Sequence, residues 1–151
     1  MSESAAGLTL IVRRVIAAPP QFLFEAWTEP RHLLAWWGPQ GVRCCAAEID
    51  LRVGGAYRIG NRLPDGTVLW IEGQFEAIEP PKRLVYSWRV TPGSGAVERV
   101  TVRFEPRGED TEVVIAHERI ADQTIRARHE AGWNGCLDGL IAHAAGRRSA
   151  R

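Results

Sequence analysis

Two histidines of this sequence lie at positions from which they could carry out acid–base chemistry. His129 falls on the apolar face of a predicted helix, one turn before Trp133, and His117 falls on a predicted strand in phase with Val113 and Ile115. Both side chains are therefore expected to point into the interior, where they could meet. Imidazole titrates near neutral pH, so an interior histidine can act as a general acid or base.

The same two histidines are open to other interpretations. They could form a hydrogen-bonded interior pair without a chemical role, because the sequence fixes no carboxylate beside either ring. A metal site built from His117, His129 and Cys136 is conceivable, but this spacing is not diagnostic of one. The sequence also contains no phosphate-binding glycine loop, nucleophile elbow, metalloprotease helix or dinucleotide fingerprint. We therefore expect no metal and no cofactor.

Glu72 is the candidate for a catalytic carboxylic acid, and its role depends on which face of its strand it occupies. If Ile71, Gly73 and Phe75 form the inner face, Glu72 points to solvent. In the opposite arrangement, burial would raise its pKa toward the range useful for acid–base catalysis. We favour the solvent-facing arrangement.

Adjacent tryptophans in the stretch "HLLAWWGPQG" raise the question of a ligand-binding role. Neighbouring positions on a helix point about 100° apart, so Trp36 and Trp37 are not expected to face the same core. We expect Trp36 to close the core and Trp37 to line the mouth of a cavity.

Prolines and β-branched residues define the elements of the first forty residues. "LTLIVRRVI" (8–16) predicts a strand, and Pro19-Pro20 predict the start of a short helix that ends before Pro30. A second short helix begins at Pro30 and ends where Gly38 can adopt a left-handed conformation.

The middle of the chain has the alternation and the regular turns of an antiparallel meander. Val100, Val102 and Phe104 alternate with polar residues, which indicates a sheet with one buried face. We predict six strands, over residues 42–51, 56–63, 67–78, 83–90, 97–106 and 111–118.

A long helix over residues 122–145 is predicted to cover the buried face. Asp122 is a plausible N-cap, and apolar residues recur at helical spacing behind it. Gly132, Gly135 and Gly139 each cost about 1 kcal/mol relative to alanine, so we expect them to form a groove that another part of the protein approaches closely. We expect residues 1–6 and 146–151 to be flexible.

The composition indicates one domain over residues 1–151. The 19 basic and 18 acidic residues nearly balance, so nucleic acid is not an expected partner. The three cysteines do not form a disulfide framework, and no segment is long and apolar enough to be inserted into a membrane. We expect a cytoplasmic protein, and a homodimer is plausible.

Five stretches of the sequence form recognisable motifs, namely "WTEPRHLLAWWGP" (27–39), "EIDLRVGGAYR" (48–58), "PDG" (64–66), "EGQFEAIEPPKRLVYSW" (72–88) and "HEAGWNGCLDGL" (129–140). In these stretches the chain resembles the activator-of-heat-shock-protein-ATPase homologues, a family of the SRPBCC superfamily. The resemblance implies an α+β, helix-grip (START-like) fold, in which a curved antiparallel sheet of about seven strands wraps around the last helix and leaves a cavity.

Three functions fit this resemblance and these residues. The first is the binding of a small hydrophobic or aromatic molecule in the cavity. The second is a cyclase- or hydrolase-type enzyme that uses His117, His129 or Glu72 as acid or base. The third is a protein-interaction module, similar to a co-chaperone. The residues expected to bind the ligand are Trp37, Tyr57, Ile59, Trp88, His117, His129, Trp133 and Leu137.

Overall fold

The computed structural model describes residues 7–39, 41–91 and 97–149. Most of the turn expected over residues 91–95 lies outside the described residues, as do residues 1–6 and 150–151. The elements in chain order are β1 (Leu8–Ile16), α2 (Pro20–Thr28), α3 (Pro30–Trp36), β2 (Arg43–Ile49), β3 (Ala56–Arg62), β4 (Val68–Glu79), β5 (Arg83–Thr91), β6 (Glu98–Arg107), β7 (Asp110–Ile120) and α4 (Gln123–Ser149).

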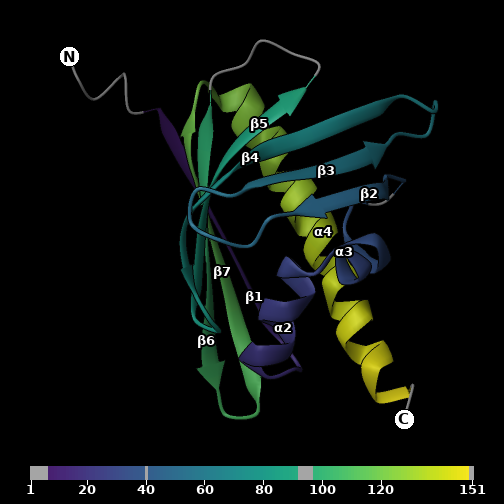
Figure 1. The fold of residues 1–151 in the computed structure, drawn as a ribbon, viewed down its shortest axis with the longest axis vertical. Helices are drawn as coiled ribbons and strands as arrows, with labels where there is room; N and C mark the ends of the chain where they lie inside the picture. Colours follow the sequence, from purple (N-terminus) through teal and green to yellow (C-terminus); the bar gives the residue numbers. More distant parts are fainter. Residues whose placement is uncertain (1–6, 40, 92–96, 150–151) are drawn as a thin grey trace.

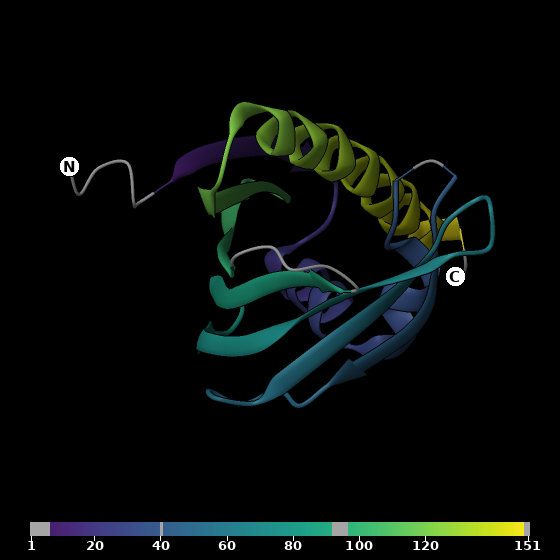
Figure 2. The ribbon, with the colours of Figure 1, turned by 90° about the horizontal axis from the view of Figure 1, so that it is seen from above.

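The seven strands form one antiparallel sheet in the order β1-β7-β6-β5-β4-β3-β2. The six strands from β2 to β7 are a meander, and β1 returns to pair with β7. The sheet curves around an interior that α4 closes on the open side, with α2 and α3 inside the curve (Figures 1 and 2). The predicted helix-grip fold is therefore confirmed.

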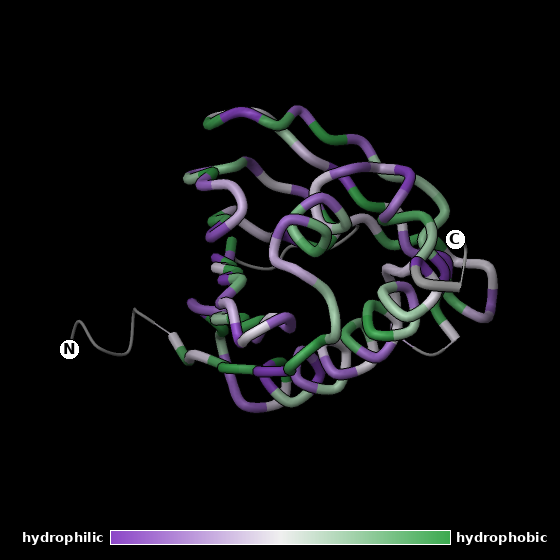
Figure 3. Tube along the Cα trace, turned by 90° about the horizontal axis from the view of Figure 1, so that it is seen from below, coloured by the Kyte–Doolittle hydropathy of each residue, from purple (hydrophilic) through white to green (hydrophobic). Residues whose placement is uncertain are grey.

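Alternating side chains put one face of the sheet into the core. Along β7, Val113, Ile115 and His117 are fully buried, whereas the residues between them are partly exposed. Figure 3 shows that hydrophobic and hydrophilic residues are interspersed along the strands of the sheet. His117, a polar residue that we predicted to belong to the site, thus occupies a core position on β7.

Prolines separate the two short helices as the sequence predicts. Pro20 occupies the first turn of α2, and Pro30 restricts Glu29 to an extended conformation that ends α2 and precedes α3. The prediction for Trp37 was wrong in one respect. Trp37 follows α3 in an extended conformation, so helical spacing does not apply to it, and both Trp36 and Trp37 are buried in the same core.

The long helix α4 begins where predicted and ends later. Oδ1 of Asp122 accepts a hydrogen bond of 2.9 Å from the backbone N–H of Ile125, so Asp122 is the N-cap. The helix continues through Ser149, beyond the predicted end at residue 145. It has 27 residues, but no helix of the described chain is both long and apolar enough to cross a bilayer.

Candidate functional site

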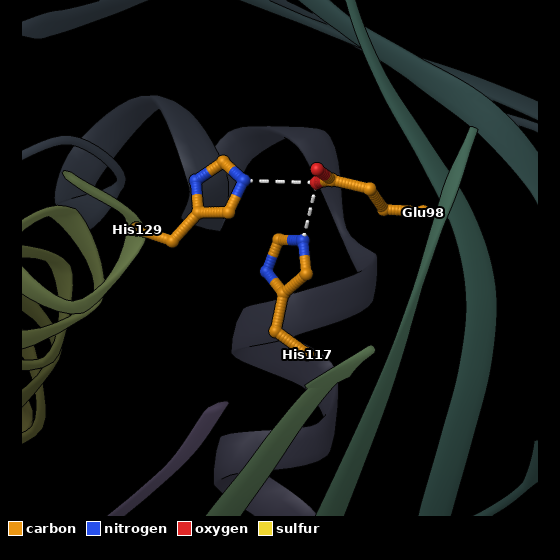
Figure 4. Close-up of side chains that lie close together, drawn as sticks. All are labelled: Glu98, His117 and His129. Atoms are coloured by element: carbon orange, nitrogen blue, oxygen red, sulfur yellow. Dashed lines mark hydrogen bonds and ion pairs between the residues drawn. The ribbon is translucent and has the colours of Figure 1, made fainter. Parts of the chain in front are cut away.

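The inward faces of β6, β7 and α4 bring one carboxylate and two imidazoles into contact (Figure 4). Oε1 of Glu98 lies 2.7 Å from Nε2 of His117 and 2.8 Å from Nε2 of His129. The two rings are stacked, with centroids 4.3 Å apart. The side chain of His117 is fully buried, and that of His129 is 17% exposed. The two histidines that were expected to meet therefore do so, and a carboxylate joins them.

The hydrogen bonds of this cluster determine where its protons lie. Nε1 of Trp133 lies 3.0 Å from Nδ1 of His117, and because an indole N–H can only donate, this Nδ1 must accept. Neutral His117 then carries its proton on Nε2, and this N–H donates a hydrogen bond to Glu98. An ionised carboxylate can only accept, so His129 also donates from Nε2. Neutral His129 is left with an unprotonated Nδ1.

The cluster holds an ionised carboxylate beside a neutral imidazole. Burial raises the pKa of Glu98, but the hydrogen bonds from His117 and His129 outweigh burial and lower the pKa to about 2. Burial lowers the pKa of His117 below the usual value for histidine, although its hydrogen bond to Glu98 acts in the opposite direction. Protonation of His117 would also break the hydrogen bond from Trp133.

The spacing of the cluster resembles a metal site with two histidines and one carboxylate. The ligand atoms of Glu98, His117 and His129 lie within 4.8 Å of one another. The tautomers argue against a metal here. A histidine that binds a metal through Nε2 carries its proton on Nδ1, and in His117 this proton would point at the N–H of Trp133.

Cys136, the third ligand considered from the sequence, is not part of this cluster. Cys136 instead lines a cavity beside the cluster. Burial raises the pKa of its thiol to about 12. A thiol in this state is a poor metal ligand because the thiolate is the form that binds.

A cavity of about 110 Å³ lies beside His129, between the sheet and α4. Its apolar walls include Trp37, Ile71, Trp88 and Trp133, and its polar lining residues are Asn61, Arg128 and His129. The three tryptophan rings pack on one another, with centroids 5.4 to 6.4 Å apart. The cavity is thus largely aromatic, with polar groups at a few positions.

The other residues expected to bind the ligand do not line this cavity. Tyr57 and Ile59 border an adjoining hollow of about 10 Å³, which shares Trp37, Ile71 and Trp88 with the cavity. A hollow of this size has room for about one water molecule. Tyr57 also borders larger hollows of about 370 and 320 Å³. His117 and Leu137 are fully buried and do not line the larger cavity. Four of the eight predicted residues therefore border the cavity, namely Trp37, Trp88, His129 and Trp133.

Hydrogen bonds hold two of the three tryptophan walls in place. Nε1 of Trp37 donates to Oδ1 of Asn61 at 3.0 Å, and Nε1 of Trp133 donates to His117. Nε1 of Trp88 is buried, and no acceptor within the described residues is in reach of it. Trp88 therefore contributes a ring to the wall and a donor that the described part of the chain does not use.

Glu72 lies on the outer face of the sheet, apart from the histidine cluster. Oε2 of Glu72 is 3.2 Å from Nε of Arg58, and its other oxygen is 3.9 Å from Arg89. Ile71 and Phe75 are buried on the inner face. Glu72 thus has the solvent-facing arrangement that we favoured, and the carboxylate beside the histidines is Glu98.

Glu98 was missed, although the sequence contains a signal for it. It lies two residues before Val100, in phase with the inward series Val100, Val102 and Phe104, and it is 8% exposed. In the sheet, Glu98 pairs with Trp88 of β5, and Val100 pairs with His117 of β7. An acidic residue in an inward register is uncommon unless it is paired, so its phase alone would have indicated a buried partner.

The fold and this site define a helix-grip protein with an aromatic cavity between its sheet and its last helix. The family described as activator of Hsp90 ATPase homolog 1-like protein matches residues 17–145. The chain therefore belongs to this family, as the resemblance predicted.

Solved structures of similar proteins have the same fold. A protein from Chromobacterium violaceum is 28% identical, with a TM-score of 0.83 over 90% of this chain and 96% of its own. The AHSA1 protein from Silicibacter pomeroyi is 27% identical, with a TM-score of 0.80 over 93% of this chain and 99% of its own. A comparison with curated proteins gives no match.

Proposed function

We propose that the protein binds a small hydrophobic or aromatic molecule in the cavity beside His129. The observation that supports this proposal is a partly open cavity of about 110 Å³ whose walls include Trp37, Trp88 and Trp133. Ligand pockets generally combine apolar walls with a few polar groups. An engineered apolar cavity of about 150 Å³ in another protein binds benzene. We therefore infer a ligand in which a single ring, or a group of that size, enters the cavity.

The proposal is tested by the thermal stability of the protein in the presence of single-ring aromatic and short aliphatic compounds. A ligand at one hundred times its Kd adds about 2.7 kcal/mol to the free energy of unfolding. For a domain of this size, 1 kcal/mol raises the Tm by about 2–4 °C, so binding should be readily measurable.

Two glycines of α4 provide a matched pair of variants for this test. An added Cβ meets no atom within 4 Å at Gly132 or at Gly146, but only Gly132 lines the cavity. Gly132→Leu should fill the space and abolish ligand binding, whereas Gly146→Leu should leave binding intact. Both variants should fold, because each replaces a helical glycine with a better helix former. Equal binding by the two variants would place the ligand outside the cavity.

An acid–base enzyme is a second candidate, because Glu98 orients His129 at the edge of the cavity. A carboxylate that holds one imidazole nitrogen leaves the other free to take a proton from a bound molecule. This function predicts turnover of a ligand found in the screen. His129→Gln should then abolish turnover and retain ligand binding. An unchanged rate in this variant would exclude His129 as the base.

The third hypothesis, a protein-interaction module, predicts an exposed apolar patch and no internal cavity. Large exposed apolar side chains do occur, among them Val15 and Val53. The aromatic cavity supports ligand binding instead. A screen in which no compound raises the Tm would redirect attention to protein partners.

A further inference from the structure

The positions of the protons in the histidine cluster predict which polar group a ligand should carry. We propose that the cavity prefers a single-ring molecule that carries a hydrogen-bond donor, such as a phenolic hydroxyl, and that this group donates to Nδ1 of His129. This inference rests on the proposed binding of a ligand in the cavity.

The hydrogen bond to Glu98 determines the tautomer of His129. Its Nε2 lies 2.8 Å from Oε1 of Glu98, and the same oxygen receives the N–H of His117 at 2.7 Å. The carboxylate has no proton to donate, so Nε2 of His129 must supply one. Figure 4 shows Nδ1 of His129 on the side of the ring away from Glu98.

Ring contacts hold the His129 side chain in position. It stacks on His117 at a centroid distance of 4.3 Å and meets Trp88 edge to face at 6.0 Å. His117 is in turn held by Trp133 and Glu98. In the Nε2–H tautomer, a rotation of the His129 ring that turned Nδ1 toward Glu98 would replace an N–H donor by a lone pair beside a carboxylate. In this neutral form of His129, the cluster therefore keeps Nδ1 as an acceptor.

The acceptor Nδ1 belongs to a residue that borders the cavity. His129 borders the cavity, and among residues 7–39, 41–91 and 97–149 no hydrogen bond reaches its Nδ1. A purely apolar ligand would displace water from this nitrogen and leave it unpaired, which costs free energy. A donor on the ligand removes this cost. An ether oxygen has only lone pairs to offer, so it gains nothing from Nδ1.

Three fluorinated compounds of similar size separate these cases. They are 4-fluorophenol, fluorobenzene and 4-fluoroanisole, and their Kd values are measured by ¹⁹F NMR at pH 7, where a phenol of pKa near 10 is neutral. A net hydrogen bond corresponds to about threefold to tenfold in affinity, so 4-fluorophenol should bind more tightly than fluorobenzene by this factor. We expect 4-fluoroanisole, which cannot donate a hydrogen bond to Nδ1 of His129, to bind less tightly than 4-fluorophenol.

Replacement of His129 tests the assignment to this residue. His129→Phe keeps a ring at the position but has no acceptor, so the three compounds should bind it with equal affinity. The control is His143→Phe, the same substitution at a histidine that does not line the cavity, which should keep the preference for 4-fluorophenol.

The possible outcomes separate this inference from the proposed function. Equal binding of fluorobenzene and 4-fluorophenol by the unmodified protein would overturn the inference and support ligand binding in the cavity. Failure of all three compounds to bind would overturn both the inference and the proposal that the cavity binds a single aromatic ring.

A second measurement needs no variant and no ligand. Long-range ¹H–¹⁵N NMR spectra of the histidine rings distinguish protonated from unprotonated ring nitrogens. We expect neutral His129 and His117 to carry their protons on Nε2. A proton on Nδ1 of His129 would overturn the inference even if a variant failed to fold.

Discussion

The two halves of α4 each contribute one histidine to a pair, and together these pairs contain all four histidines of the sequence. In the first half, His129 meets His117 through the shared oxygen of Glu98. In the second half, Nε2 of His143 lies 2.9 Å from Nδ1 of His32, with no carboxylate between the two rings. The same pair of residue types therefore has an interior anion in one place and a direct contact in the other.

The glycines of the two halves of α4 differ in how closely other atoms approach them. A Cβ added at Gly132 would meet no atom within 4 Å, whereas one added at Gly139 would lie 2.6 Å from the carbonyl oxygen of Trp36. The second half of α4 is thus packed directly on α3, and the first half borders the cavity. In the predicted glycine groove, Gly139 is a site of close approach, whereas Gly132 is part of the wall of the cavity.

One helix therefore combines a close contact with the wall of a cavity. The tight packing at Gly139 and at the pair His32–His143 fixes the distance between α3 and α4. This contact keeps α4 in place where its other half does not fill the interior. Substitutions at the two histidine pairs and at the glycines of α4 test this division.

The largest effect is expected for His117→Ala. This change leaves a void in the core, removes one hydrogen bond from Glu98 and leaves the N–H of Trp133 unpaired. We expect a loss of about 3 kcal/mol in the free energy of unfolding, measured by urea denaturation. His143→Ala, in the half-buried pair, should cost about 1 kcal/mol or less. Equal losses would show that the two pairs contribute alike.

Glu98→Gln should alter how stability depends on pH. The pKa of Glu98 is about 2 in the folded protein, below its ordinary value, so the unfolded chain takes up this proton first as the pH falls. The contribution of Glu98 is therefore complete above about pH 5 and is lost as the pH falls toward 2.

The expected size follows from the shift in pKa. At pH 6, the free energy of unfolding of the unmodified protein should exceed that of Glu98→Gln by about 2–3 kcal/mol. This difference should shrink as the pH falls toward 2. Urea denaturation at a series of pH values measures it. A difference that stays constant between pH 6 and pH 2 would contradict the assigned charge.

Gly139→Ala tests the rigid contact between α3 and α4. The added methyl group meets backbone, which has little room to shift, so we expect a loss of about 2 kcal/mol. Gly146→Ala is the control, because its Cβ has free space and the variant should gain up to about 1 kcal/mol in helix stability. A gain at both positions in chemical denaturation would mean that α4 can move away from α3.

His143→Gln should have the smallest effect. Burial, and then the neighbouring His32, lower the pKa of His143, so the unfolded chain binds this proton more readily than the folded protein. Stability should fall as the pH drops below about 6.5, and the variant should lose less than the unmodified protein between pH 7 and pH 5.

Part of this decline should persist in His143→Gln, because the pKa of the buried His117 is also lowered. The measurement is the free energy of unfolding at both pH values. An identical decline in the variant would assign the whole effect to other groups.

Local rules predicted most of the fold, because its elements depend on short-range patterns. Prolines bounded α2 and α3, Asp122 capped α4, and alternation placed His117 on the inner face of β7. These features depend on a few neighbouring residues in each case. The resemblance to a family then supplied the arrangement of the elements in space.

The site was harder to predict because it depends on contacts between distant segments. Glu98 and His117 come together through the register of β6 and β7, and His129 joins them from α4. Trp37 was misplaced because the helix ends one residue earlier than the spacing argument assumed. The volume of the cavity depends on the rotamers of Trp88 and Trp133, which one-dimensional patterns do not contain.

The tryptophan wall limits which side chains around the cavity can change. Trp37 and Trp133 also pack against the core ring of Trp27, with centroids 6.4 and 6.1 Å away, so a change in either ring would disturb the core as well as the cavity. Gly132 borders the cavity without such contacts, and Arg128 at its edge is exposed. We expect natural variation in the shape of the cavity among similar proteins to accumulate at these two positions, while the aromatic rings stay the same.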